Sequence, residues 1–600
     1  MSIKKTDCFL TERKSRIAAS ALLALTVSIM IFVVIPFEIY CNNLPELTFS
    51  VSDFIGIQLL LALALSLLIF SLLVFSPHVV YEYVYPALVG VLLMFFLQGN
   101  YLNVGLSSLD GDELGGGVAP STYVWNTAVW LLVIGGSVLA YRLIKQKSTV
   151  KLAAIIVSVA VLATQLMNFS VSSLSTEGAY DSAIDRVYGK YAENPRFLTN
   201  KGIGTVGSQK NVIVICVDRF DTLLYVEPAM QKYPKSFEAL DGFTFYRDAV
   251  SLYGYTFPSV AYMMSAIEYD HSGDRLAYFD RVYQENQTIS RLHELGYSVH
   301  LFSEAYYDYS NANELPNYVE NAIETDRESL ETKNRFPDRF ALSITKMSLY
   351  RIFPFVLKST VGGVSSDTCN EYILYTSRDL SGYHAYSYDM KDVYKDILRR
   401  LKVGFEAKGE KNFTFLHISG CHNAKYDENW KKSGHKKDVL VSAKNSMELI
   451  SSYLNGIKAI SEDLYRDSTI IIMGDHGKVL HPLKDFSAPM MTAFFVKPSG
   501  EAGTELRISD APVAQENLWA TIFESEGIDY DSTAFAPSVF TVEQNFLESG
   551  DYPERKFIWT ARKVGMTSYD TVEYKITGPA RDFSSWHVDA RNHYDNTLFH

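Results

Sequence analysis

The chain has 600 residues, of which 48% are hydrophobic and 20% charged, so it is too apolar for a disordered protein and too charged to lie wholly within a membrane. Its net charge of −13, without any tract rich in Lys and Arg, argues against nucleic acid as a partner. The five cysteines include no Cys-x-x-Cys pair and are too few for a disulfide scaffold, although a disulfide between Cys369 and Cys421 stays open.

Five apolar segments lie near the N-terminus, and each is long enough to cross about 30 Å of hydrocarbon. They are residues 16–40, 54–75, 79–97, 123–141 and 152–169. Lysines and arginines gather before the first segment and between the fourth and fifth, whereas the connections at 41–53 and 98–122 carry acidic residues and no basic one. By the positive-inside rule, the N-terminus is cytoplasmic.

Five crossings from a cytoplasmic N-terminus predict a multi-pass protein of the cell membrane, with the rest of the chain outside the cytoplasm. A cleaved signal peptide is the alternative for the first segment, but its apolar run is longer than usual and four more follow. The segments contain no ion pair or repeated Gly/Pro break that would mark a transport path, so we interpret them as an anchor. We expect a transmembrane domain of five helices at 1–169, a linker at 170–210 and an extracytoplasmic domain at 211–600.

After residue 210 the sequence alternates between short apolar runs and longer amphipathic stretches. The runs are residues 211–217, 297–302, 413–418, 469–473 and 491–496, and the amphipathic stretches include 391–405 and 439–464. Runs rich in β-branched residues are typical of strands covered on both faces, and helix-length stretches between them allow parallel crossovers. The pattern predicts an α/β domain with a mostly parallel sheet and helices on both faces.

In such a sheet, ligands bind beyond the carboxyl ends of the strands, so the residues that follow each run are the candidates for a site. Asp218 follows the first run, and Asp475-His476-Gly477 follows the fourth. Taken alone, these have ordinary interpretations as a helix N-cap and a capped turn. Together they offer carboxylate oxygens and an imidazole nitrogen, which suit Zn²⁺ or Mn²⁺ better than Ca²⁺ or Mg²⁺.

The combination of motifs is more specific than any single one. In chain order it comprises a strand that ends in Asp218, then Asp241-Gly-Phe-Thr-Phe-Tyr-Arg-Asp248, Thr256-Phe-Pro-Ser259, Leu416-His-Ile-Ser-Gly-Cys-His422 and Gly474-Asp-His-Gly477. This content and order resembles the alkaline phosphatase/sulfatase superfamily. Five membrane segments before an external domain are similar to the branch of lipoteichoic acid synthases, which are phosphoglycerol transferases, and phosphoethanolamine transferases.

The resemblance implies roles for four residues. Asp218, Asp475 and His476 would bind one divalent metal ion, Mn or Zn, and Thr256 would be both its fourth ligand and the nucleophile. Thr256 stands two residues before Pro258, as the nucleophile does in this family, and a hydroxyl bound to a dication can ionise near neutrality. Three other hydroxyl residues of this loop remain alternative nucleophiles: Ser251, Tyr253 and Ser259.

The resemblance also implies residues that contact the substrate phosphate. His422 matches the histidine that follows the glycine of the strand-end motif, which contacts the substrate phosphate or serves a second metal. We expect contact with the phosphate, because the further Asp or His ligands of a second metal site cannot be identified in the sequence. His417, within the strand, is interpreted as a packed core residue. His481 is a candidate proton donor to the leaving group, and Lys484 and Arg219 are candidate phosphate clamps. For these last three, a solvated surface residue is the alternative interpretation.

Three departures from the family pattern narrow the expectation. No Cys is followed two residues later by Pro, so the Cys-x-Pro-x-Arg signature of formylglycine-dependent sulfatases is missing. Aromatic residues, in place of cysteines, flank Thr256, which favours a phosphoglycerol transferase over a phosphoethanolamine transferase. The first ligand is Asp218, where lipoteichoic acid synthases use Glu, and this loosens the match to that family.

The expected function is therefore transfer of a phospholipid-derived headgroup, phosphoglycerol or phosphoethanolamine. Thr256 would take the headgroup from a membrane phospholipid, and an envelope glycan or glycolipid would accept it. Anchoring favours transfer because donor and acceptor meet at the bilayer surface. The alternative is a metal-dependent phosphodiesterase or sulfatase-like hydrolase that uses water. A third possibility, a non-catalytic domain that binds envelope polymer, is disfavoured by the presence of the metal ligands.

Overall fold

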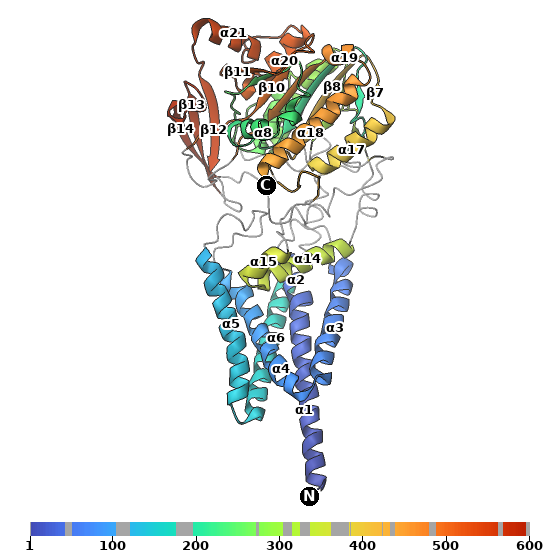
Figure 1. Ribbon diagram of the computed structural model, residues 1–600, viewed down its shortest axis with the longest axis vertical. Coiled ribbons are helices and arrows are strands. Elements are labelled where there is room, and N and C mark those ends of the chain that lie inside the picture. The colour runs from blue at the N-terminus through green and yellow to red at the C-terminus, as the bar shows by residue number, and fades with distance from the viewer. Residues whose placement is uncertain are drawn as a thin grey trace. The chain divides into compact units, whose positions relative to one another are not determined.

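The computed structural model describes residues 2–42, 51–103, 120–175, 196–271, 275–303, 315–324, 337–361, 383, 386–422, 424–431, 438–478, 488–561 and 568–595. The chain forms two compact units (Figure 1). The helical unit comprises Met1–Ala192 and Arg327–Ser377, and the sheet unit comprises Glu193–Asp326 and Arg378–His600.

The helical unit is a bundle of apolar helices that run side by side (Figure 1). Its helices are α1 (Ser2–Ile29), η1 (Met30–Val34), α2 (Ile35–Asn42), α3 (Val51–Phe75), α4 (His78–Leu97), η3 (Gln98–Leu102), α5 (Pro120–Leu143) and α6 (Lys147–Ser175). Four stretches are long and apolar enough to cross a membrane: Lys14–Cys41, Val51–Phe75, His78–Leu102 and Pro120–Leu143.

The fifth predicted span falls in α6, where the apolar helix within the described residues is the shorter Ser148–Thr164. Four candidate spans are thus found among the described residues, and the fifth stays a prediction. Leu60 of α3 and Leu132 of α5 are 68% and 73% exposed, as expected of side chains that face lipid tails rather than water.

The helical unit also contains a segment that the sequence-based division leaves in the domain at 211–600. It forms two helices, α14 (Pro337–Ile352) and α15 (Phe355–Val361), which lie beside the ends of the membrane helices (Figure 1). Phe340, Ile344 and Met347 recur at helical spacing and join the apolar core of the bundle. The ring of Phe340 meets that of Phe54 in α3 edge-on, with 5.1 Å between ring centroids. An apolar stripe in the middle of the chain therefore packs with the membrane helices.

The sheet unit is built on a seven-stranded sheet with the order β11-β4-β10-β9-β3-β8-β5. In this order the strands are Arg507–Ser509, Thr244–Tyr246, Phe494–Lys497, Thr469–Gly474, Lys210–Val217, Lys411–Ile418 and Tyr297–Phe302. Strands β9, β3, β8 and β5 are parallel, whereas β10 is antiparallel to both β9 and β4. The sheet is therefore mixed. Its parallel part contains four of the five runs that the sequence predicts as strands, and the fifth run overlaps β10.

Helices cover both faces of this sheet. Along β3, Val214 packs into one apolar core and its neighbours Ile213 and Ile215 pack into the other, because alternate side chains of a strand point to opposite faces. The first core includes α9 (Thr256–Ser265), α10 (Arg275–Gln284), α11 (Ile289–Glu294), α20 (Leu518–Glu526) and α21 (Val539–Ser549). The second includes α8 (Glu227–Lys232), α17 (Met390–Val403), α18 (Val439–Lys458) and α19 (Glu462–Arg466).

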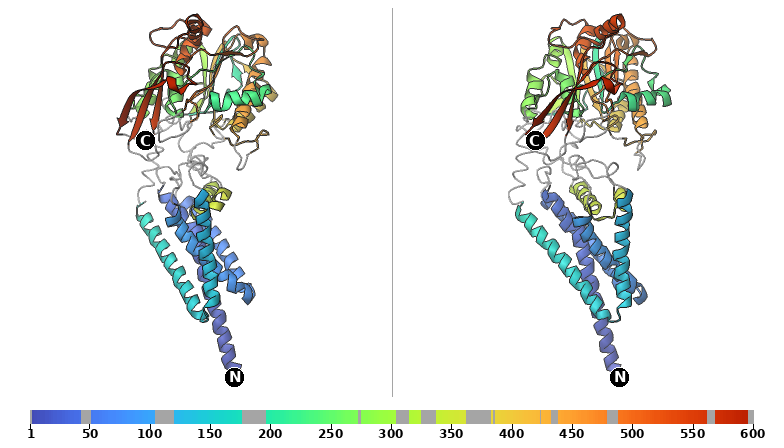
Figure 2. Two further views of the ribbon diagram at one scale, coloured as in Figure 1. Left: turned by 60° about the vertical axis from the view of Figure 1, so that its left-hand side comes forward. Right: turned by 90° about the vertical axis from the view of Figure 1, so that its left-hand side faces the viewer.

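Smaller elements complete the sheet unit. The strand pairs are β1 (Arg196–Leu198) with β6 (Ala322–Glu324) and β2 (Thr205–Val206) with β7 (Glu406–Ala407). An antiparallel sheet of β12 (Arg555–Ala561), β13 (Tyr569–Ile576) and β14 (Trp586–Tyr594) stands at one side of the unit (red in Figure 2). Short helical turns are η4 (Thr222–Val226), η5 (Pro234–Phe237), η6 (Gln515–Asn517) and η7 (Phe583–Ser585).

Candidate active site

The carboxyl ends of neighbouring strands bring the candidate residues together. Val217, the last residue of β3, pairs with Gly474 of β9 on one side and with Ile418 of β8 on the other. Asp218 and Asp475 are the next residues along β3 and β9. Because these strands are parallel and in this register, both carboxylates emerge at the same edge of the sheet.

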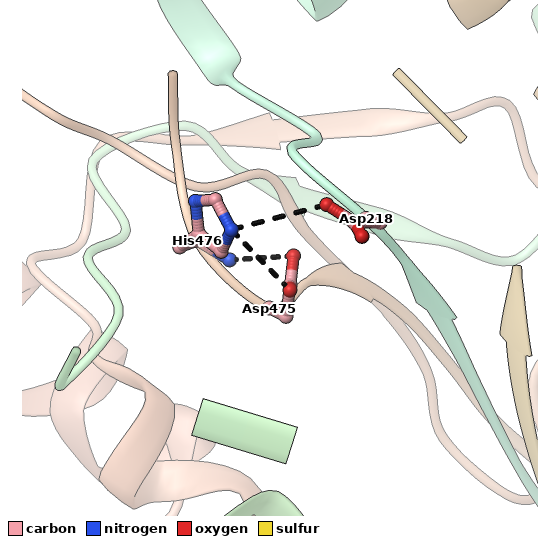
Figure 3. Close-up of side chains that lie close together, drawn as sticks. All are labelled: Asp218, Asp475 and His476. Carbon is pink, nitrogen blue, oxygen red and sulfur yellow. Dashed lines mark hydrogen bonds and ion pairs between the residues drawn. The ribbon is translucent and has the colours of Figure 1, made fainter. Parts of the chain in front are cut away.

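Asp218, Asp475 and His476 form a buried cluster at this edge (Figure 3). One ligand atom from each lies within 4.8 Å of the others. Nε2 of His476 is 3.8 Å from Oδ1 of Asp218 and 3.5 Å from Oδ2 of Asp475. Among the described residues, neither of these two carboxylate oxygens has a hydrogen-bond partner. Because a buried oxygen without a partner is costly, the cluster fits a divalent cation.

The other polar atoms of Asp475 and His476 are held by hydrogen bonds. Oδ1 of Asp475 accepts from the backbone N–H groups of Arg219 (3.0 Å) and His476 (2.8 Å). Nδ1 of His476 lies 2.6 Å from the carbonyl oxygen of Gly477, which assigns the proton to Nδ1 and leaves Nε2 as the ligand atom. A Cβ on Gly477 would lie 2.5 Å from the carbonyl oxygen of Met491, so the turn that presents His476 requires glycine.

The two carboxylates of the cluster disfavour each other's charge. Burial raises the pKa of the Asp218 carboxyl well above its usual value, and the neighbouring Asp475 raises it further. A proton or a cation at the cluster relieves this repulsion, and a divalent cation does so while both carboxylates stay ionised.

Thr256, the first residue of α9, lies at the same cluster. Its Oγ1 is 3.4 Å from Nε2 of His476 and 3.5 Å from Oδ2 of Asp218. The loop that leads to it is held by β12, because the N–H of Ile558 donates to the carbonyl oxygen of Leu252 at 2.7 Å. The hydroxyl is thus buried among the groups that can bind a metal.

The other hydroxyl residues of the loop are engaged elsewhere. Oγ of Ser251 donates to the carbonyl oxygen of Tyr253 at 2.8 Å, and the hydroxyl of Tyr253 accepts from the N–H of Tyr269 at 2.9 Å. Oγ of Ser259 donates to the carbonyl oxygen of Asp475 at 2.6 Å. Oγ1 of Thr256, in contrast, contacts both a carboxylate and the imidazole of the cluster.

Arg219 and His422 border the cluster. Arg219 directly follows Asp218 with a φ of 55°, and its Nη1 is 3.5 Å from the carbonyl oxygen of His422. Within the described ranges, Nε of Arg219 and Nδ1 of His422 are buried without a hydrogen-bond partner. Burial, followed by the charge of Arg219, lowers the pKa of His422 well below its usual value, so its imidazole is neutral. These two nitrogen atoms could therefore form hydrogen bonds with a molecule bound at the cluster.

The remaining sequence candidates divide into two groups. His417 is fully buried in β8, and burial lowers its pKa to about 4, consistent with a neutral core residue. Cys421 is a free, buried thiol. Three residues lie outside the described part of the chain: Cys369, His481 and Lys484.

Two residues at the site were missed by the sequence reasoning. The hydroxyl of Tyr388 donates to Oδ2 of Asp218 at 3.0 Å. Nε2 of Gln515 donates to Oγ of Ser259 at 2.8 Å, and Oε1 of Gln515 accepts from the N–H of Leu252 at 3.1 Å, which ties the loop before Thr256 to α9. A single tyrosine or glutamine far from the motifs has no spacing that could have identified it.

Comparisons with known proteins place these observations in a family. A model of the sulfatase family matches residues 210–528, more than half of the chain. A search of curated proteins finds no match.

Several solved structures are similar to the chain at low identity. One is the integral membrane protein lipooligosaccharide phosphoethanolamine transferase A (EptA) from Neisseria meningitidis, with 12% identity over 86% of this chain and 97% of that chain and a TM-score of 0.30. The lipoteichoic acid synthase LtaP from Listeria monocytogenes has 12% identity over 65% and 87% of the two chains and a TM-score of 0.29. An alkaline phosphatase superfamily protein from Vibrio parahaemolyticus has 12% identity over 66% and 84% and a TM-score of 0.33. The match of the family model over more than half of the sequence shows that the chain belongs to the sulfatase family, within the alkaline phosphatase superfamily.

Proposed function

We propose that the chain is a metal-dependent transferase that moves a phosphoglycerol or phosphoethanolamine headgroup from a membrane phospholipid to an envelope glycan or glycolipid. The observation that carries the proposal is the position of Thr256 Oγ1 within 3.5 Å of two of the three groups that can hold a metal. The membrane-spanning stretches favour a lipid as the donor.

Four side chains would hold the metal in this proposal. Asp218, Asp475 and His476 supply two oxygens and one nitrogen, a donor set that suits Mn²⁺ or Zn²⁺, and Thr256 supplies the fourth atom. When bound, the cation lowers the pKa of the threonine hydroxyl and offsets charge on the phosphoryl oxygens. The hydrogen bond from Nδ1 of His476 to Gly477 keeps the ring in the tautomer that can bind.

The reaction has two displacements at phosphorus. Oγ1 of Thr256, after its proton passes to solvent, attacks the phosphodiester, the bond from phosphorus to the diacylglycerol oxygen breaks, and this oxygen takes a proton that His481 would donate. A glycan hydroxyl then attacks the phosphorus of phospho-Thr256 and returns a proton to His481, while the bond from phosphorus to Oγ1 breaks and the threonine oxygen is released. Arg219, His422 and Lys484 would bind the phosphoryl oxygens, because positioning and electrostatics supply most of the catalysis in such transfers.

The proposal also requires that the sheet unit lie on the side of the membrane where the acceptor is found. We place the N-terminus in the cytoplasm and let α6 complete a fifth crossing, which puts the sheet unit outside the cytoplasm with the envelope polymers. The four spans found by length and composition support anchoring, and the basic residues before the first span support the orientation of the N-terminus.

The direct test uses the full chain in membranes with labelled phosphatidylglycerol or phosphatidylethanolamine. We expect release of diacylglycerol and a covalent adduct on the peptide that contains Thr256, whose added mass identifies the headgroup. Thr256→Ala should give neither product. If neither lipid is cleaved and the native chain behaves like the Thr256→Ala variant, the proposal is wrong.

A hydrolase is the second candidate, because the same threonine and metal-binding residues would serve water as the final acceptor. Turnover of a soluble diester at an equal rate with and without glycan would identify the hydrolase. Turnover that stops after one equivalent until a glycan or glycolipid is added would identify the transferase.

A further inference from the structure

Each residue of the metal-binding cluster has one polar atom that faces the other two and one that is held from behind. For Asp475 and His476 the held atom is bound by groups of the two motifs themselves: the backbone of Arg219 and His476, and the carbonyl oxygen of Gly477. These partners follow directly from the strand ends.

Asp218 differs, because a distant side chain holds it. Its Oδ1 faces His476, whereas its Oδ2 accepts a hydrogen bond from the phenol of Tyr388 at 3.0 Å. The hydroxyl of Thr256 lies at the longer distance of 3.5 Å from the same oxygen. Of these two contacts with the carboxylate, the hydrogen bond from the phenol of Tyr388 is therefore the shorter one.

Tyr388 is itself fixed on several sides. Its carbonyl oxygen accepts from the N–H of Ser419 at 2.9 Å, and its ring lies 5.1 Å from the ring of His417. Two residues earlier, the hydroxyl of Tyr386 donates to the carbonyl oxygen of His417 at 2.5 Å. The phenol thus reaches Asp218 from a backbone that is tied to β8 and the turn after it, so it can hold the carboxylate in one place.

The segment that carries Tyr388 begins soon after the chain returns from the helical unit to the sheet unit. The chain passes between the helical unit and the sheet unit at Ala192–Glu193, Asp326–Arg327 and Ser377–Arg378. Residues close to all three passages bond to one another within the sheet unit: Leu198 pairs with Ala322, and the N–H of Tyr386 donates to the carbonyl oxygen of Leu198 at 2.9 Å. Tyr388 follows Tyr386 by two residues and therefore connects these paired segments of the sheet unit with Asp218.

We propose that Tyr388 is a positioning residue, which fixes the carboxylate of Asp218 so that Oδ1 is turned toward the metal. This inference rests on the metal site of the proposed function, not on the transfer reaction. A hydrogen bond from behind a ligand holds its orientation, and removal of such partners typically weakens metal binding about 10–100-fold. The opposing interpretation is structural: a buried phenol has simply found an acceptor.

A matched control is available nearby. The hydroxyl of Tyr426 donates to Oδ1 of Asp389 at 2.8 Å. This is also a hydrogen bond from a phenol to a carboxylate, and Asp389 is the residue that follows Tyr388. Among the residues that the structure describes, Asp389 belongs to no metal-binding group, so Tyr426→Phe removes an equivalent bond without affecting a ligand.

The experiment measures the affinity of the metal-free full chain for Mn²⁺ and Zn²⁺ by competition with a chelator, together with the melting temperature without metal. We expect Tyr388→Phe to weaken binding about tenfold or more, Tyr426→Phe to leave it unchanged, and the two variants to shift the metal-free melting temperature alike. Equal affinities of Tyr388→Phe and the native chain, or equal losses in both variants, would overturn the inference. A native chain that binds neither ion would overturn it together with the proposed metal site, whereas an unchanged Tyr388→Phe beside a native chain that binds metal would overturn the inference alone.

Discussion

Each unit of the chain contains a cluster of buried polar side chains, and the two clusters differ in whether their polar atoms have hydrogen-bond partners within the protein. In the helical unit, Oε1 of Gln98 accepts from Nδ2 of Asn126 at 2.8 Å and from Nε1 of Trp130 at 3.0 Å, while its Nε2 donates to Oδ1 of Asn103 at 2.8 Å. Oδ1 of Asn126 accepts from the N–H of Phe355 in α15 at 3.1 Å. Each of these groups has a partner within the protein.

The same cluster extends to α14. Nδ2 of Asn103 donates to the carbonyl oxygen of Arg351 at 2.8 Å, and the guanidinium of Arg351 pairs with Glu38 of α2 at 2.9 Å. Gln58 of α3 donates to the carbonyl oxygen of Ala341 at 2.8 Å. These polar residues of the membrane helices thus bind the helices α14 and α15.

The cluster of Asp218, Asp475 and His476 is instead left open at its centre, where the described residues offer no partner to two carboxylate oxygens. A closed network fixes one segment against another, whereas an open one is complete only when a ligand is bound.

The largest expected effect is on the chemistry at the open cluster. Thr256→Ala should reduce diacylglycerol release by at least about 10⁴-fold, because loss of a covalent nucleophile removes the reaction path itself. Thr256→Ser keeps a hydroxyl and should retain part of the activity. The rate of diacylglycerol release from labelled lipid measures both, and equal rates for the alanine and serine variants would rule out Thr256 as the nucleophile.

The next prediction concerns a substitution that should lower the metal affinity of the open cluster and raise the melting temperature of the metal-free chain. In Asp475→Asn the amide oxygen can still accept from Arg219 and His476, while its NH₂ can donate toward Asp218. We expect metal affinity to fall about 100-fold or more, and the metal-free chain to melt at a higher temperature, because one of two repelling carboxylates is gone. Melting curves with and without chelator test this. A metal-free variant less stable than the native chain would show that the cluster is not open.

The closed cluster should respond in the opposite way. Gln98→Leu leaves the donors of Asn126 and Trp130 without their acceptor, so we expect a loss of about 1–2 kcal/mol that no added metal restores. Thermal unfolding in lipid nanodiscs measures it. Gln146→Leu, at an exposed position of the same unit, is the control and should change little. A loss that Mn²⁺ reverses would contradict the distinction between the two clusters.

The smallest effect concerns a buried carboxyl group, that of Glu516, which belongs to no metal-binding group among the described residues. Burial raises the pKa of Glu516 to about 7, and its Oε2 has no hydrogen-bond partner in the described part of the chain. An acid with a raised pKa stays protonated in the fold while the unfolded chain ionises, so stability falls as pH rises from the unfolded value of about 4.3 through 7.

Glu516→Gln should therefore raise the melting temperature at pH 8 and leave it almost unchanged at pH 4. Thermal unfolding at the two pH values provides the check. An equal shift at both would mean that the carboxyl does not titrate in this range.

The parts of the molecule that were visible in the sequence share a physical cause. Strands β3, β5, β8 and β9 are buried on both faces, so each leaves a continuous apolar run, and the residues after two of them are the metal-binding candidates. The short strands β4 and β11 have only three residues each and leave no such run.

The docking of α14 on the membrane helices was not visible for a different reason. Its stripe of Phe340, Ile344 and Met347 has the period of any helix packed against a core, and the period does not identify which core. Tyr388 was missed because its partner, Asp218, is distant in sequence and adjacent only in the fold.

The return of the chain to the helical unit in mid-sequence governs how the protein can be divided. A fragment that starts at Glu193 would still contain Arg327–Ser377, and without the bundle the apolar face of α14 would be exposed to water. One proteolytic cut just before Glu193 would not release the sheet unit, because it would stay joined to Arg327–Ser377, which belongs to the helical unit. Release of the sheet unit would require excision of this segment as well, so the return of the chain in mid-sequence ties the sheet unit to the helical unit.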